Sequence, residues 1–180
     1  MAKTQNPYNS LGKNYYEILI SLKNSTANHT ITNQNDFQKF LNVNHISSYN
    51  FTLNTSEENL LKTFFTTFTI DRGMAQLIDF EGNISTNYPS NQNLLRTLAV
   101  LKYGIFFTSY SSSANVNSAQ EFAASSTPGA CSRRNECIDR CLCTKAHNLS
   151  KSNWVDKAYF MIIAVESFAV WVVSCEWDCW

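Results

Sequence analysis

The sequence predicts a mainly α-helical protein with one small β-hairpin near residues 75–86. Three observations lead to this fold class: apolar residues recur at helical spacing through most of residues 1–108, small polar residues dominate 109–130, and all six cysteines follow residue 130. We therefore expect three parts in the 180-residue chain. These are a helical N-terminal domain over 1–108, a Ser/Ala-rich linker over 109–130, and a cysteine-rich module with an apolar helix over 131–180.

The N-terminal region begins with three segments whose apolar side chains share one helical face. These faces comprise Tyr15, Ile18, Leu19 and Leu22 in the first segment, Phe37, Phe40 and Leu41 in the second, and Leu60, Leu61, Phe64, Phe65 and Phe68 in the third. The expected N-caps are Asn9 or Ser10 for the first, Thr32 or Asn33 for the second, and Thr55 for the third, where Glu58 completes a capping box. The apolar faces are expected to form a hydrophobic core.

The hairpin is predicted from a turn signal between two apolar stretches. The stretch Leu77-Ile78-Asp79-Phe80 is followed by Glu81-Gly82-Asn83 and then Ile84. After the hairpin, Ser90 is expected to open a helix over about 92–107, whose apolar residues again repeat at helical spacing.

Composition and charge exclude several classes of function. Lys and Arg number 14, as do Asp and Glu, so the formal net charge is zero. Proteins that bind nucleic acid neutralise phosphates with an excess of basic residues, so we expect no nucleic-acid partner. Hydrophobic residues reach 44%, which is enough to build a core. No constellation of catalytic residues emerges, and the chain is not predicted to be an enzyme.

The first residues do not have the pattern of a secretory signal. The stretch after Met1 is polar, and the first apolar stretch, 15–22, contains Glu17 and is not followed by a small-residue cleavage site. We expect the protein to lie outside the cell or at its surface. It would reach this location by a route without an N-terminal signal peptide, and the cytoplasm is the alternative.

The density of cysteine in the last fifty residues is typical of a disulfide scaffold. The six cysteines are Cys131, Cys137, Cys141, Cys143, Cys175 and Cys179. Cys137 and Cys141 are four residues apart, as are Cys175 and Cys179, so each pair projects from one face of a helix. Two antiparallel segments could then be joined by two disulfide rungs, with Cys131 and Cys143 closing a local loop.

A metal site is the alternative use of the same segment. Cys137, Cys141, Cys143 and His147 place three thiolates and an imidazole within eleven residues, a ligand set that suits tetrahedral zinc. A reducing compartment would favour zinc over disulfides. Otherwise no cofactor is expected.

Between the cysteine groups runs an apolar segment, Ala158 to Val173, in which only Glu166 and Ser167 are polar. Basic residues precede it and acidic residues follow it, and tryptophans flank it, as in segments that contact a membrane. The candidate membrane-contact residues are Trp154, Phe160, Ile163, Phe168, Trp171, Trp177 and Trp180. The alternative is a helix buried in the core, with Glu166 at its edge.

The whole layout resembles that of cysteine-rich bacteriocin or toxin precursors. The resemblance implies that the disulfide-stapled C-terminal module is a membrane-active peptide, masked by the N-terminal part until cleavage. Gly129 and Ala130, directly before Cys131, then mark the processing site. The implied partner is a membrane surface or a membrane protein. The alternative function is a non-catalytic, soluble structural or interaction domain stapled by disulfides or zinc.

Overall fold

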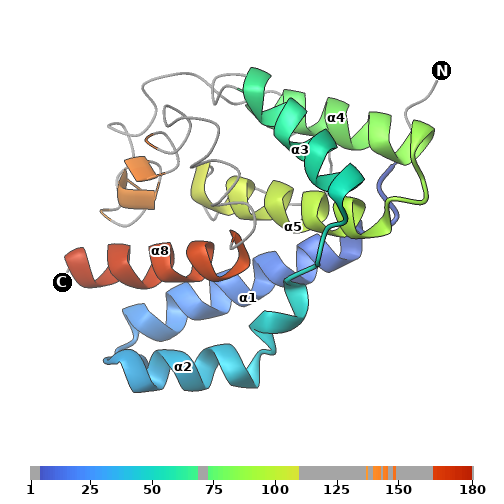
Figure 1. Ribbon diagram of the computed structural model, residues 1–180. Coiled ribbons are helices and arrows are strands. Elements are labelled where there is room, and N and C mark those ends of the chain that lie inside the picture. Colours follow the sequence, from blue (N-terminus) through green and yellow to red (C-terminus); the bar gives the residue numbers. More distant parts are fainter. Residues whose placement is uncertain are drawn as a thin grey trace.

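The computed structural model describes residues 5–68, 73–109, 137, 140–142, 144–145, 148 and 164–179. Within these residues the protein is helical and contains no β-strand (Figure 1). The elements are α1 (Asn9–Ala27), α2 (Gln34–Val43), the short 3-10 helix η1 (Ile46–Tyr49), α3 (Thr55–Thr67), α4 (Gly73–Asn87), α5 (Gln92–Ser109) and α8 (Ala164–Asp178). The predicted mainly α fold is confirmed.

Helix α5 occupies the middle of the fold (Figure 1). It contacts α1 and α8 on one side and α3 and α4 on the other. Leu94, Leu98 and Leu101 of α5 are buried, and so are Val100 and Phe106 at other angles around the same helix. A helix that is apolar around most of its circumference must be covered on several sides, which explains why four helices pack around it.

The packing of α1 on α5 depends on a glycine. A Cβ atom at Gly12 would lie 2.5 Å from the carbonyl oxygen of Ala99 and 2.3 Å from the ring of Tyr103. Residue 12 therefore has to lack a side chain for the two helices to approach this closely. Further along α1, Tyr15 and Leu19 are completely buried in the same core.

The segment predicted as a β-hairpin is helix α4, so that prediction is wrong. Met74, Leu77 and Ile84 are buried at intervals of three and seven residues, which is the period of a helix. Helix α4 packs along α5, and these three residues belong to the shared hydrophobic core. The turn signal around Gly82 is overridden because burial of a continuous helical face outweighs the roughly 1 kcal/mol cost of one glycine inside a helix.

The caps agree with the sequence at one helix and differ at two. Asn33 caps α2 as expected, because its side chain accepts hydrogen bonds from the backbone N–H groups of Asn35 and Asp36. Helix α1 has Tyr8 at its N-cap with no side-chain bond, since the side chain of Asn9 accepts a hydrogen bond from Lys102 instead.

The capping box of α3 lies one residue earlier than predicted. It joins Asn54 and Glu57, with both backbone-to-side-chain distances at 3.0 Å, instead of Thr55 and Glu58. Both pairs have the same spacing in the sequence. The earlier pair is selected because the Glu57 carboxylate also accepts a hydrogen bond from the backbone N–H of Leu94 in α5.

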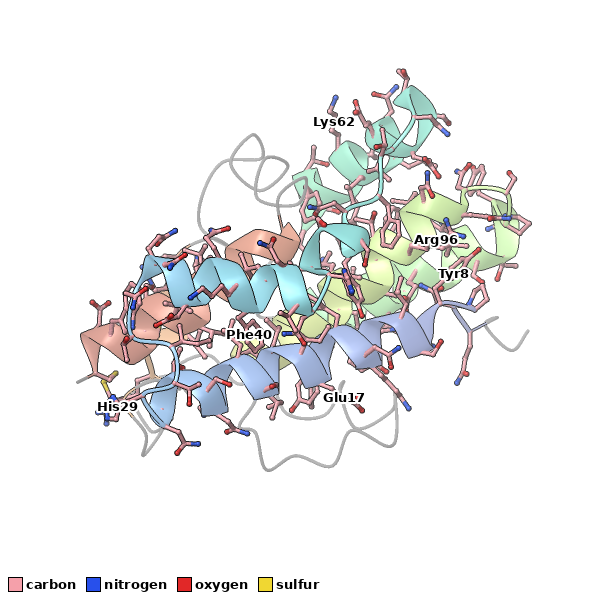
Figure 2. All side chains as sticks on the ribbon, turned by 90° about the horizontal axis from the view of Figure 1, so that it is seen from below. Tyr8, Glu17, His29, Phe40, Lys62 and Arg96 are labelled. Atoms are coloured by element: carbon pink, nitrogen blue, oxygen red, sulfur yellow. A yellow bond between two sulfur atoms is a disulfide. The ribbon has the colours of Figure 1, made fainter. Side chains whose placement is uncertain are left out.

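The residues just before α1 contact α4 and α5. The buried side chain of Asn6 donates to the Glu81 carboxylate at 2.5 Å and to the carbonyl oxygen of Leu95 at 2.7 Å. Beside it, the guanidinium of Arg96 lies 4.8 Å from the ring centre of Tyr8 (Figure 2) and 5.7 Å from that of Phe51. These cation–π contacts join two loops to the first turns of α5.

Candidate functional site

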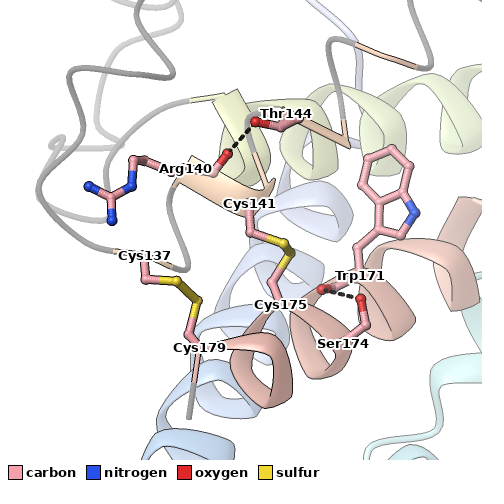
Figure 3. The surroundings of a disulfide bond; sticks show 8 residues. All are labelled: Cys137, Arg140, Cys141, Thr144, Trp171, Ser174, Cys175 and Cys179. Carbon is pink, nitrogen blue, oxygen red and sulfur yellow. Dashed lines mark hydrogen bonds between the residues drawn. A yellow bond between two sulfur atoms is a disulfide. The ribbon is translucent and has the colours of Figure 1, made fainter.

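Two disulfides join the cysteine-rich segment to the end of α8 (Figure 3). Cys137 pairs with Cys179 and Cys141 with Cys175, with Cα–Cα distances of 5.9 and 5.6 Å. This is the arrangement of two rungs between antiparallel segments that the four-residue spacing indicates. Cys131 and Cys143, predicted to close a local loop, lie outside the described residues.

Local helical geometry aligns the two rungs. Cys137 and residues 140–142 are helical, and the hydroxyl of Thr144 donates to the carbonyl oxygen of Arg140 at 2.8 Å, an i to i−4 bond. Cys175 lies in the last turns of α8, and Cys179 follows its end. Residues four apart on a helix project in nearly the same direction, so both cysteines of each segment face the other segment.

One face of α8 belongs to the hydrophobic core. Phe168, Val172 and Cys175 are at most 1% exposed, and the helix packs against α1, α5 and η1. The ring of Phe168 fills the space over Gly104 of α5, where an added Cβ atom would lie 2.3 Å from it. This contact ties α8 to the middle of the fold.

Three of the seven candidate membrane-contact residues lie in α8. Phe168 is buried against α5, and Trp171 is half-buried with its ring 5.7 Å from that of Phe168. Trp177 is 37% exposed, and Val170 on the same helix is 49% exposed. The other four candidates, Trp154, Phe160, Ile163 and Trp180, lie outside the described residues. No helix in the described part of the chain has the length and apolarity needed to cross a membrane.

The zinc alternative and the disulfides compete for the same sulfur atoms. Cys137 and Cys141 are both disulfide-bonded here, and zinc binds cysteine as the thiolate. Cys143 and His147, the other two candidate ligands, are not among the described residues. Within the described ranges, no cluster of three or more His, Cys, Asp or Glu side chains is placed to hold a metal.

The processing residues and the linker also fall outside what the structure describes. Gly129 and Ala130 belong to this group, as does the predicted linker from residue 110 onward. Its first residue, Ser109, is the last residue of α5.

A buried ion pair was missed by sequence reasoning. The ammonium of Lys102 in α5 lies 2.6 Å from the carboxylate of Glu81 in α4, and each side chain is at most 5% exposed. Asn6 and Asn9 complete the hydrogen bonds of the two charges. Lys102 interrupts the apolar stretch 98–107, and this is a sequence signal for a buried charge that needs a partner. The partner, Glu81, was not recognised because residues 75–86 were predicted to form a hairpin.

The environment of this pair also affects a neighbouring tyrosine. Burial, with a smaller contribution from the negative charge of Glu81, raises the pKa of Tyr103 to about 12. The phenol therefore stays neutral and its ring lies 5.6 Å from the ammonium of Lys102. Because both charges of the pair are matched inside the protein, the arrangement joins α4 and α5 instead of offering a reactive group to a substrate.

Comparisons with protein-family models, with curated proteins and with solved structures find no match to this chain. The disulfide-stapled, helical C-terminal segment is a feature of the structure itself. A bacteriocin or toxin function draws no support from a relative.

Proposed function

We propose that the protein is a non-catalytic helical domain with a structural or binding role, and that its disulfide-stapled C-terminal module completes its core. One observation carries this proposal: α8 packs its apolar face against α1 and α5. Burying a large apolar side chain contributes about 1.5–3 kcal/mol. Phe168, Val172 and Val173 together therefore make α8 a major contributor to the stability of the N-terminal helices.

The chemistry of the described residues supports a non-catalytic role. The buried acids have structural partners: Glu81 pairs with Lys102, and Glu57 caps α3 while accepting a hydrogen bond from α5. A general acid or base has to reach a substrate, and a carboxylate saturated by internal donors does not.

The disulfides support a location in an oxidising environment. Disulfides persist outside the cell and in oxidising compartments, whereas thiols are kept reduced in the cytosol. We therefore propose a secreted or cell-surface location. The two rungs then add about 2–4 kcal/mol each in the usual range for such bonds.

A masked precursor of a membrane-active peptide is the second candidate. It is favoured by the position of the two disulfides, which lie entirely within 131–180 and would keep that module closed after cleavage in 109–130. The packing of α8 on α1 and α5 would mask its apolar face before cleavage. In this case the exposed Trp177 and the released face of Phe168 would enter a membrane.

Limited proteolysis between residues 109 and 130 separates the two candidates. For the shared-core domain, we expect the cut fragments to stay associated under native conditions, and the separated fragments to lose helical circular dichroism. Neither the intact nor the cut protein should release dye from vesicles that contain anionic lipid.

The opposite result supports the precursor. A 131–180 fragment that dissociates as a folded, soluble peptide and permeabilises the vesicles would overturn the shared-core proposal. Trp177→Ser is the matched variant, because Trp177 is partly exposed and lies outside the core. It should leave the stability of the intact domain within about 0.5 kcal/mol, but weaken vesicle release if the peptide acts on membranes.

A further inference from the structure

The two disulfides differ in their accessibility. Cys137 is exposed and Cys179 is partly exposed beyond the last turn of α8, so their bond, which we call the outer disulfide, lies at the edge of the fold. Cys175 is completely buried and its partner Cys141 is partly exposed, while Leu142 beside Cys141 is 1% exposed. The Cys141–Cys175 bond, which we call the inner disulfide, lies one helical turn further from the end of α8 than the outer one (Figure 3) and has one completely buried partner.

This difference decides which bond an external thiol can attack. Thiol–disulfide exchange requires a thiolate to reach one sulfur atom, and its rate depends on that access. The outer disulfide can be reached in the folded protein. The inner disulfide is less accessible, because Cys175 is completely buried and only Cys141 is partly exposed.

The loss of the outer disulfide leaves the module joined. The inner disulfide still links residues 34 positions apart in the sequence. The outer disulfide is a second link between the same two segments, only one helical turn further along each of them. The buried side chains of α8, Phe168 and Val172 among them, also remain in the core. Only the end of α8, with Trp177 and Cys179, is released from the opposing segment.

We propose that the outer disulfide is a site of reversible exchange with an external dithiol, whereas the inner disulfide is structural. In this reaction the external dithiol is oxidised to its disulfide and gives up two electrons and two protons. The Cys137–Cys179 bond breaks and both residues become thiols. The inference rests on the accessibility of the sulfur atoms and does not depend on the proposed function.

Graded reduction of the full-length oxidised protein tests the proposal. The protein is treated with increasing dithiothreitol, quenched in acid, alkylated with N-ethylmaleimide and mapped by peptide mass. We expect alkylation of Cys137 and Cys179 to appear at least about tenfold faster than that of Cys141 and Cys175, because the outer bond joins an exposed and a partly exposed cysteine, whereas the inner bond has one completely buried partner. Helical circular dichroism should be unchanged when the outer bond is half reduced.

The proposal is overturned if the four cysteines become alkylated together, if the inner pair reacts first, or if helicity falls with the first two thiols. The variant C137S/C179S tests the stated cause. Its inner disulfide should be reduced as slowly as in the parent protein, within about threefold, because Cys175 stays buried and Cys141 stays only partly exposed. Fast reduction in this variant would mean that burial is not the protection, and would also overturn the proposal.

Discussion

Glu57 acts at the start of two helices at once. One carboxylate oxygen accepts from the backbone N–H of Asn54, and the other accepts from that of Leu94 in the first turn of α5. Glu57 is 2% exposed, and its bond to Leu94 is buried whereas its bond to Asn54 is partly buried. A negative charge is favoured at a helix N-terminus by the free N–H groups and the helix dipole, which explains why a lone carboxylate is stable there.

Replacing Glu57 with alanine is expected to lower the free energy of unfolding by about 2–4 kcal/mol, because the buried N–H of Leu94 and the partly buried N–H of Asn54 both lose a charged acceptor. Urea denaturation followed by circular dichroism measures the loss. The matched control is Glu58→Ala, whose side chain is 43% exposed and 3.6 Å from Lys62. It should cost no more than about 0.5 kcal/mol. Similar losses for the two variants would show that the link from α3 to α5 is not stabilising.

Gly104 sets how closely α8 approaches α5. Gly104→Ala is expected to destabilise the protein by about 1–3 kcal/mol, since the new methyl group overlaps the ring of Phe168. Shortening the opposing side chain should relieve the overlap. The loss in free energy of unfolding for G104A/F168L should therefore be smaller than the sum of the losses for the two single variants. Urea denaturation of the four proteins measures this coupling. Additive losses would mean that the two residues do not limit each other.

At the scale of elements, α4 and α5 are held together by both apolar packing and a buried ion pair. Removing one charge leaves the other buried without its partner, so Lys102→Met is expected to cost about 3–5 kcal/mol. The double variant K102M/E81L should recover much of this loss, because apolar side chains of similar size replace the pair. A double-mutant cycle by urea denaturation measures the recovery. If the double variant is as unstable as both single losses combined, the pair is not coupled.

The elements also show where sequence patterns were sufficient. Helices α1, α3 and α5 were predicted because their apolar residues repeat on one face, and these faces are buried. The start of α3 was shifted by one residue because the choice between two equal capping pairs depends on Leu94, which is distant in sequence. Helix α4 was missed because a local turn signal competes with a helical face that is covered by α5 and by the Phe64 ring of α3.

At the scale of the whole molecule, the protein should lose stability at alkaline pH. Burial raises the pKa of Tyr15 well above its usual value, with a smaller contribution from nearby Tyr49, and the pKa of Tyr103 is raised from 10.0 to about 12. An unfolded tyrosine ionises near pH 10, while a buried one in the folded protein stays neutral. Between the two pKa values the folded state binds more protons, so the free energy of unfolding falls as pH rises.

The change at Tyr103 alone is expected to lower stability by at most about 1.4 kcal/mol for each pH unit between about 10 and 12. Urea denaturation from pH 8 to pH 11 measures this slope. In Tyr103→Phe the slope should be smaller, whatever constant change the lost hydroxyl causes at neutral pH. An unchanged slope in that variant would show that Tyr103 is not responsible for the alkaline loss.

The sequence by itself determined the helical character of the chain and the spacing of its cysteines into two matching pairs. Both are local properties, because helical periodicity and the four-residue interval are set by neighbouring residues. The tertiary structure alone decided what covers the apolar C-terminal helix. The sequence of α8 indicates an apolar helix face but not what this face packs against. Either a lipid surface or a protein core could bury it. The space over Gly104, formed by residues far away in sequence, places Phe168 in the core.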